Sequence, residues 1–173
     1  ESFFLRPARV LTILLSAIAA LAALNLTAGT ARALEAIWQG TFSEFWTNDF
    51  NWFGASPPVP ADKASFDDSA VVAVLRPAII LDANRTVLEF VVRGNHAIAG
   101  AYSFTSFNNA VLTVTEQTTF GFSGSSTSTT TLDGFRLNTD RLFVQGPMTV
   151  DMTGGAVVTT TSDLEMFDTS VLN

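Results

Sequence analysis

The chain has 173 residues, of which 47% are hydrophobic and 14% are charged, and it contains no cysteine. A typical soluble domain has about 25% charged residues, so this surface carries fewer charges than usual. The absence of cysteine excludes disulfides, thiolate metal sites and a cysteine nucleophile, and the net charge of −7 argues against a nucleic-acid partner.

The first 33 residues have the layout of a secretory signal peptide. Arg6 and Arg9 precede an uncharged apolar run from Val10 to Leu24, and the segment ends in Ala31-Arg32-Ala33, which matches an A-x-A cleavage site. The apolar run is shorter than the roughly 20 residues of a membrane-spanning helix. We therefore expect a signal-peptide helix over residues 1–33, export across the inner membrane of a bacterium, and a mature chain that begins at Leu34.

Two regions of different composition follow. Residues 34–66 are rich in aromatic and turn-forming side chains, including Trp38, Trp46 and Trp52. Residues 67–173 consist of short segments that alternate between apolar and polar side chains and are separated by Gly, Asn, Pro or Asp. No segment after the signal peptide has the spacing of an amphipathic helix, so the mature chain is predicted to be all-β.

The alternation predicts strands with one buried face over residues 87–93, 102–105, 112–115, 135–137 and 148–152. In the first of these, Leu88, Phe90 and Val92 are expected to face the interior. Leu112 and Phe135 are expected to face inward in two later strands. The Ser/Thr-rich residues 124–131 are predicted to run from a Gly-Ser turn into a further strand, because threonine favours extended structure.

The predicted strands recur with a rhythm that is typical of a solenoid. Strand centres near Phe90, Thr113, Arg136 and Val158 are about 23 residues apart, which lies within the range of solenoid repeats. The positions that face inward shift by one residue from one repeat to the next, so the repeat is irregular.

The start of the mature chain resembles bacterial autotransporter-type passenger domains and exported proteins with autotransporter-associated β-strand repeats. The residues that carry the resemblance are W-x-G from Trp38, N-W at Asn51-Trp52, and P-x-D-x-A-x-F from Pro60 to Phe66, followed by strands near residues 79–82 and 87–92. The resemblance covers residues 38–92 and implies a right-handed parallel β-helix carried outside the cell, often followed by an outer-membrane barrel. This chain contains no such barrel and stops in mid-rung, so we expect the solenoid of residues 67–173 to be truncated, or anchored in another way.

The aromatic residues 34–66 are expected to cap the first rung, because open sheet ends act as templates for aggregation. An alternative is that Trp38, Trp46 and Trp52 form a platform on which a sugar ring stacks. Asn51 is expected to satisfy backbone groups in a turn rather than to contact a ligand.

Few residues suggest chemistry. His96 is the single histidine, which excludes a multi-histidine metal site, and it is expected to lie exposed in a turn. Asp62 and the pair Asp67-Asp68 have the oxygen ligands that calcium prefers, but no calcium-loop motif accompanies them, so we expect solvated turns. The basic residues are scattered. We therefore expect no catalytic residue, no cofactor and no metal.

These observations favour a non-enzymatic β-helix passenger region at the cell surface or secreted, with a role in adhesion or as a structural stalk. Its expected partners are surface glycans or neighbouring cells. The mature part is not expected to be embedded in a membrane, and any anchor would lie outside this chain. The alternative is an extracellular carbohydrate-binding module or polysaccharide-active enzyme on the same fold, and the enzyme would require acids and bases that converge on one face.

Overall fold

The computed structural model describes residues 33–173, apart from residues 55, 68–77, 95–101, 123–127 and 168–169. The predicted signal peptide lies outside the described residues, except for Ala33. Residues 33–173 form a unit of their own. Within the described part of the chain, no helix is both long and apolar enough to span a membrane.

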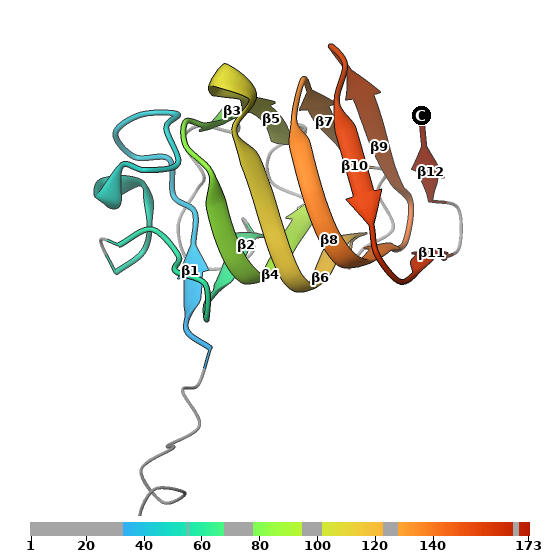
Figure 1. The fold of residues 1–173 in the computed structure, drawn as a ribbon, viewed down its shortest axis with the longest axis horizontal. Coiled ribbons are helices and arrows are strands. Elements are labelled where there is room, and N and C mark those ends of the chain that lie inside the picture. The colour runs from blue at the N-terminus through green and yellow to red at the C-terminus, as the bar shows by residue number, and fades with distance from the viewer. Residues whose placement is uncertain (1–32, 55, 68–77, 95–101, 123–127, 168–169) are drawn as a thin grey trace, which may run out of the picture. The chain divides into compact units, whose positions relative to one another are not determined.

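Parallel strands form two sheets, a large one and a small one (Figure 1). The strands of the large sheet are β1 (Glu35–Ile37), β2 (Lys63–Asp67), β4 (Arg85–Gly94), β6 (Val111–Phe122), β8 (Arg136–Val144), β10 (Val157–Thr160) and β11 (Leu164–Met166). Those of the small sheet are β3 (Ala78–Leu81), β5 (Tyr102–Ser106), β7 (Ser128–Asp133), β9 (Met148–Thr153) and β12 (Val171–Leu172). Two 3-10 turns, η1 (Asp49–Asn51) and η2 (Phe107–Asn109), complete the described regular structure.

From β2 to β10 the chain alternates between the sheets, so each of these turns adds one strand to each sheet. The large sheet runs in the order β1-β2-β4-β6-β8-β10, with β11 also paired to β8, and the small sheet runs β3-β5-β7-β9-β12. Every one of these strand pairs is parallel. The protein is therefore an all-β parallel solenoid of about four turns, which confirms the predicted fold. The strand expected in the Ser/Thr-rich segment is β7.

The core lies between the two sheets and is strongly aromatic. Phe104 of the small sheet contacts Phe66, Phe90 and Phe135 from the large-sheet side, with ring centres 5.0, 5.3 and 5.6 Å apart. Burial of these rings removes much apolar surface from water and fixes the distance between the sheets. The predicted inward positions Phe90, Leu112 and Phe135 are all fully buried, which confirms the strand phase at these residues.

The prediction that Leu88 faces inward is wrong. Val87 and Phe90 are fully buried, whereas Leu88 is partly exposed. The register between β4 and β6 shifts at this point, because β6 contains one extra residue at Thr115–Glu116. A bulge of this kind bends a strand and changes which residues face inward. Strict alternation along β4 therefore fails at the bend.

The repeat is irregular because the turns differ in length, and the bulge in β6 adds a shift of one residue. Phe90 pairs with Thr118, and Thr113 pairs with Asn138, so the predicted strand centres are not equivalent positions. The first turns are longer than 23 residues, whereas the pairing of β8 with β10, between Arg136 and Val157, closes a shorter turn. Solenoid turns tolerate such differences in length because each rung contacts only its neighbours.

Buried threonines satisfy polar backbone next to the bend. Thr118 and Thr139 are at most 2% exposed. The Thr118 hydroxyl donates to the Thr139 hydroxyl at 3.0 Å, and the Thr139 hydroxyl donates to the carbonyl of Arg141 at 2.9 Å. Since a buried carbonyl without a partner is destabilising, these hydroxyls allow the strand to bend inside the core.

Turns between the sheets use residues that tolerate left-handed backbone. Asn108 and Asn109 have φ values of 52° and 58°, and Gly134 and Gly154 have values of 61° and 58°. Gly134 donates its N–H to the carbonyl of Thr153, which links the turns of adjacent rungs. These turns therefore fall at the Gly and Asn residues that separate the alternating segments in the sequence.

We predict that Phe90→Ala lowers the free energy of unfolding by about 3–5 kcal/mol, because it leaves a cavity among close-packed rings. Thr113→Ala, on the outer side of β6, is expected to change it by no more than about 0.5 kcal/mol. Chemical denaturation of residues 34–173 measures both values. Equal losses at the two positions would show that the assigned strand faces are wrong.

Candidate functional site

The three tryptophans that were predicted to cap the solenoid or to bind a sugar lie together in the interior. Trp38, Trp46 and Trp52 are at most 1% exposed. The Trp52 ring lies 5.2 Å from Trp38 and 4.9 Å from Trp46, edge-on in both cases. All three rings also contact the buried ring of Phe66. This packing supports the cap, and a sugar could stack on these indoles only if the cap opened.

The cap is bonded to the edge of the large sheet. Strand β1 pairs with β2 on one side. On its other side, Phe53 donates its N–H to the carbonyl of Ile37 at 2.8 Å, and Trp38 forms an antiparallel bridge with Trp52. The C-terminal end of the first strand is therefore paired on both sides, which hinders another chain from extending this edge.

The cap also covers the first strand of the small sheet. Trp46 donates its N–H to the carbonyl of Ile80 at 2.9 Å, and Ile80 donates its N–H to the carbonyl of Glu44 at 2.7 Å. These bonds form a parallel bridge between Phe45 and Ile80. The Thr47 hydroxyl donates to the carboxylate of Asp82 at the end of β3. One loop therefore closes both sheets at the N-terminal end.

Asn51 holds this loop in shape from within. Its side chain is fully buried. Its amide oxygen accepts the N–H groups of Phe42 and Ser43, both at 3.0 Å, and its amide nitrogen donates to the Ser43 hydroxyl and the Phe45 carbonyl, both at 2.9 Å. All four hydrogen-bonding positions of the amide are used, which confirms the prediction that Asn51 satisfies backbone groups in a turn.

Four phenylalanines of the cap remain exposed although the loop that carries them is firmly bonded. Phe42 and Phe50 are 63% and 60% exposed and contact each other, with ring centres 5.0 Å apart. Phe45 and Phe53 are exposed at separate places on the loop. Sequence analysis did not separate these rings from the buried tryptophans, because aromatic content alone does not show which rings face outward.

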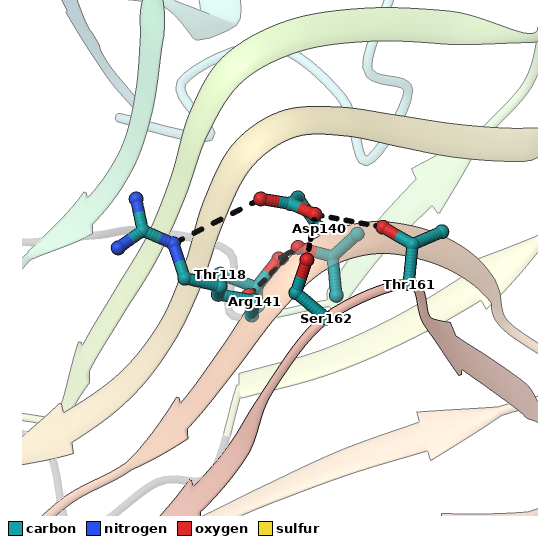
Figure 2. A network of polar contacts seen from close by, with 6 residues as sticks. Thr118, Asp140, Arg141, Thr161 and Ser162 are labelled. Atoms are coloured by element: carbon teal, nitrogen blue, oxygen red, sulfur yellow. Dashed lines mark hydrogen bonds and ion pairs between the residues drawn. The ribbon is translucent and has the colours of Figure 1, made fainter.

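A polar cluster lies at the bend of β8, where Asp140 meets the next rung (Figure 2). One carboxylate oxygen of Asp140 accepts the hydroxyls of Thr161 and Ser162, at 2.8 and 2.6 Å. The other lies 3.9 Å from the guanidinium of Arg141. Thr161 also lines an open surface hollow of about 250 Å³ that includes Thr113 and Asn138. Because the bonded residues are 21 and 22 positions apart, sequence reasoning had no signal that would find this cluster.

The hydrogen bonds from Ser162 and Thr161 lower the pKa of Asp140 below its ordinary value of 3.8, and the charge of Arg141 adds to this effect. A lowered folded-state pKa means that the folded protein binds the proton more weakly than the unfolded chain does. The resulting stabilisation is fully present above the ordinary pKa and is lost as the pH falls through the lowered value. This cluster therefore secures the last rung in its ionised form.

The carboxylates considered as calcium ligands have structural partners or lie outside the described residues. Asp62 accepts the N–H groups of Leu34 and Val59, at 3.3 and 3.0 Å. Asp68 and His96 are outside the described residues, and so is the side chain of Asp67. Among the residues that the structure describes, no group of three or more His, Cys, Asp or Glu side chains is placed to hold a metal ion.

The two sheets differ in charge. All basic side chains in the described part of the chain lie on strands of the large sheet, namely Lys63, Arg85, Arg93, Arg136 and Arg141. Lys63 forms an ion pair with Glu35 at 2.9 Å and, by donating a hydrogen bond, lowers the pKa of that carboxyl. The five strands of the small sheet contain no basic residue.

No family model, curated protein sequence or solved structure matches this chain.

We predict that Trp52→Ala lowers the free energy of unfolding by about 3–5 kcal/mol and promotes aggregation, because it removes the ring between Trp38 and Trp46. Phe50→Ala, which truncates an exposed ring of the same cap, is the matched control and is expected to have little effect. Thermal melting and light scattering measure both properties. A Trp52→Ala protein that melts normally but loses glycan binding would support the sugar-stacking alternative instead.

We further predict that Asp140→Asn makes the free energy of unfolding depend less on pH at acid pH. The wild type should lose this stabilisation as the pH falls below the ordinary aspartate pKa of 3.8, whereas the variant lacks this part of the loss. Asp163→Asn removes the same charge from the neighbouring turn and is the matched control for the loss of one negative charge. Urea unfolding at a series of pH values distinguishes them, and identical curves for the wild type and Asp140→Asn would contradict the assigned role.

Proposed function

We propose that this chain is exported and that its β-solenoid acts as a non-enzymatic surface-interaction or stalk module of a bacterial cell. The main support is the alignment of polar side chains in rows across the outside of the rungs. On the large sheet, Thr86, Thr113, Asn138 and Thr159 follow one another in register. Repeated groups of this kind suit many weak contacts spread over a broad surface.

Two further observations support the proposal. The three tryptophans and five of the described phenylalanines pack the interior, so the outer rows of polar side chains and the exposed rings of the cap are what a partner would meet. The layout of residues 1–33 is that of a signal peptide, and the motifs in residues 38–92 resemble those of autotransporter-type passenger domains. An exported solenoid with a polar exterior is suited to contact other surfaces.

The test is to display residues 34–173 on bacteria that do not clump and to measure sedimentation and attachment to surfaces. We expect the displayed solenoid to increase one or both. Display of Phe90→Ala at the same level is the control for folding, because its core is disrupted. Unchanged behaviour of cells that display the folded protein would refute the interaction role.

The purified protein should show no turnover of polysaccharides, esters or peptides, with or without calcium. This follows from the lack of converging acids and bases in the sequence, and colorimetric or mass-spectrometric assays of product measure it. Turnover that is lost on substitution of a surface carboxylate would move the protein to the enzyme class.

A further inference from the structure

The outer face of the small sheet combines an exposed aromatic ring with rows of hydroxyls and carboxylates. The bridge between Phe45 and Ile80 places both residues on the same side of the sheet. Ile80 lies between the buried residues Ile79 and Leu81 and therefore points outward. Phe45, 47% exposed, begins this outer row.

Register extends the row across the solenoid. Ile80 pairs with Thr105, Thr105 with Asp133, and Asp133 with Thr153. Adjacent strands are about 4.8 Å apart, so the path from Phe45 to Asp133 covers roughly 14 Å. This length suits an extended chain rather than a single small molecule.

A second row runs beside the first. Ser103 pairs with Thr131, and Thr131 pairs with Asp151. All three side chains are partly exposed. Asp151 accepts the side-chain amide of Asn173 at 2.8 Å, and Asp133 accepts the Thr153 hydroxyl at 3.3 Å. A carboxylate accepts about four hydrogen bonds, so both retain capacity for a ligand's hydroxyl groups.

The charges on this face restrict the class of ligand. The described strands of the small sheet carry two aspartates, Asp133 and Asp151, and no basic side chain. A ligand with phosphate, sulfate or carboxylate groups would meet like charges, and the described strands of this sheet offer no compensating cation. A neutral chain with many hydroxyls and an apolar ring face matches the aromatic, hydroxyl and carboxylate groups present.

We propose that the outer face of the small sheet binds a neutral, linear polysaccharide across its rungs, with Phe45 as the stacking ring and Thr105, Thr131 and Asp133 as hydrogen-bonding partners. This inference rests on the proposed surface-interaction role and names the partner of that role. It places sugar stacking on an exposed phenylalanine rather than on the buried tryptophans.

The test uses residues 34–173, which contain their own core and cap, on an array of cello-, manno-, laminari- and chito-oligosaccharides, with heparin and oligogalacturonate as anionic probes. We expect binding to at least one neutral oligosaccharide and none to the anionic probes. Equal binding to the anionic probes would overturn the charge argument.

Matched variants locate the site. Phe45→Ala and Thr105→Val should each weaken binding about tenfold, with unchanged melting temperatures. Phe42→Ala truncates an exposed ring of the same cap, and Thr113→Val removes an outward hydroxyl from the large sheet, so both should bind as the wild type does. Equal losses in these controls would place the site elsewhere and overturn the proposal.

The two proposals fail in different ways. Increased clumping by displayed wild type without binding to any neutral oligosaccharide would refute the glycan site and leave the surface-interaction role intact. An absence of both clumping and binding would refute both. Increased clumping that Phe45→Ala abolishes and Phe42→Ala preserves would support both.

Discussion

The structure depends on the pairing of each rung with the one before it. Parallel strands that stack in this way always leave an unpaired edge at the first rung, and such edges recruit other chains. Here one loop closes the edges of both sheets, through Phe53 on β1 and through Trp46 on β3. Three indoles fill the space beneath the loop, and Asn51 fixes its backbone. The cap thus pairs backbone groups at the edges of both sheets and also buries the three indole rings.

The opposite end of the described solenoid is different in character. The strands β10, β11 and β12 pair with β8 and β9 on one side, and three of their apolar side chains, Val157, Leu164 and Val171, are more than 40% exposed. Here side-chain hydrogen bonds add to the backbone pairing and to the stacked rings of Phe143 and Phe167. Asp140 binds Thr161 and Ser162, and Asp151 binds Asn173. Stability is therefore expected to fall along the solenoid from the cap towards β12.

Much of the fold could be predicted from the sequence because a solenoid is built from local alternation. Leu112 lies before the extra residue in β6, and Phe135 lies directly before β8, so a period of two assigned their faces correctly. Leu88 was assigned wrongly because the bend beside it depends on the extra residue in β6, a property of the pairing rather than of β4 itself. The Asp140 cluster could likewise not be predicted, because it depends on the register that brings Thr161 and Ser162 next to Asp140. For the tryptophans, the sequence indicated a cap but not the arrangement in which their rings bury one another.

The arrangement separates the residues that stabilise the fold from those that meet a partner. Inward positions such as Phe104 touch several rings from other rungs, so their substitution affects the whole core. Outward positions such as Thr105 and Thr131 are partly exposed on a flat sheet, where substitutions usually change stability by no more than about 0.5 kcal/mol. The outer rows can therefore change their chemistry without loss of the fold. The confinement of described basic residues to one sheet shows that the two outer faces already differ in this way, so each is suited to a different class of partner.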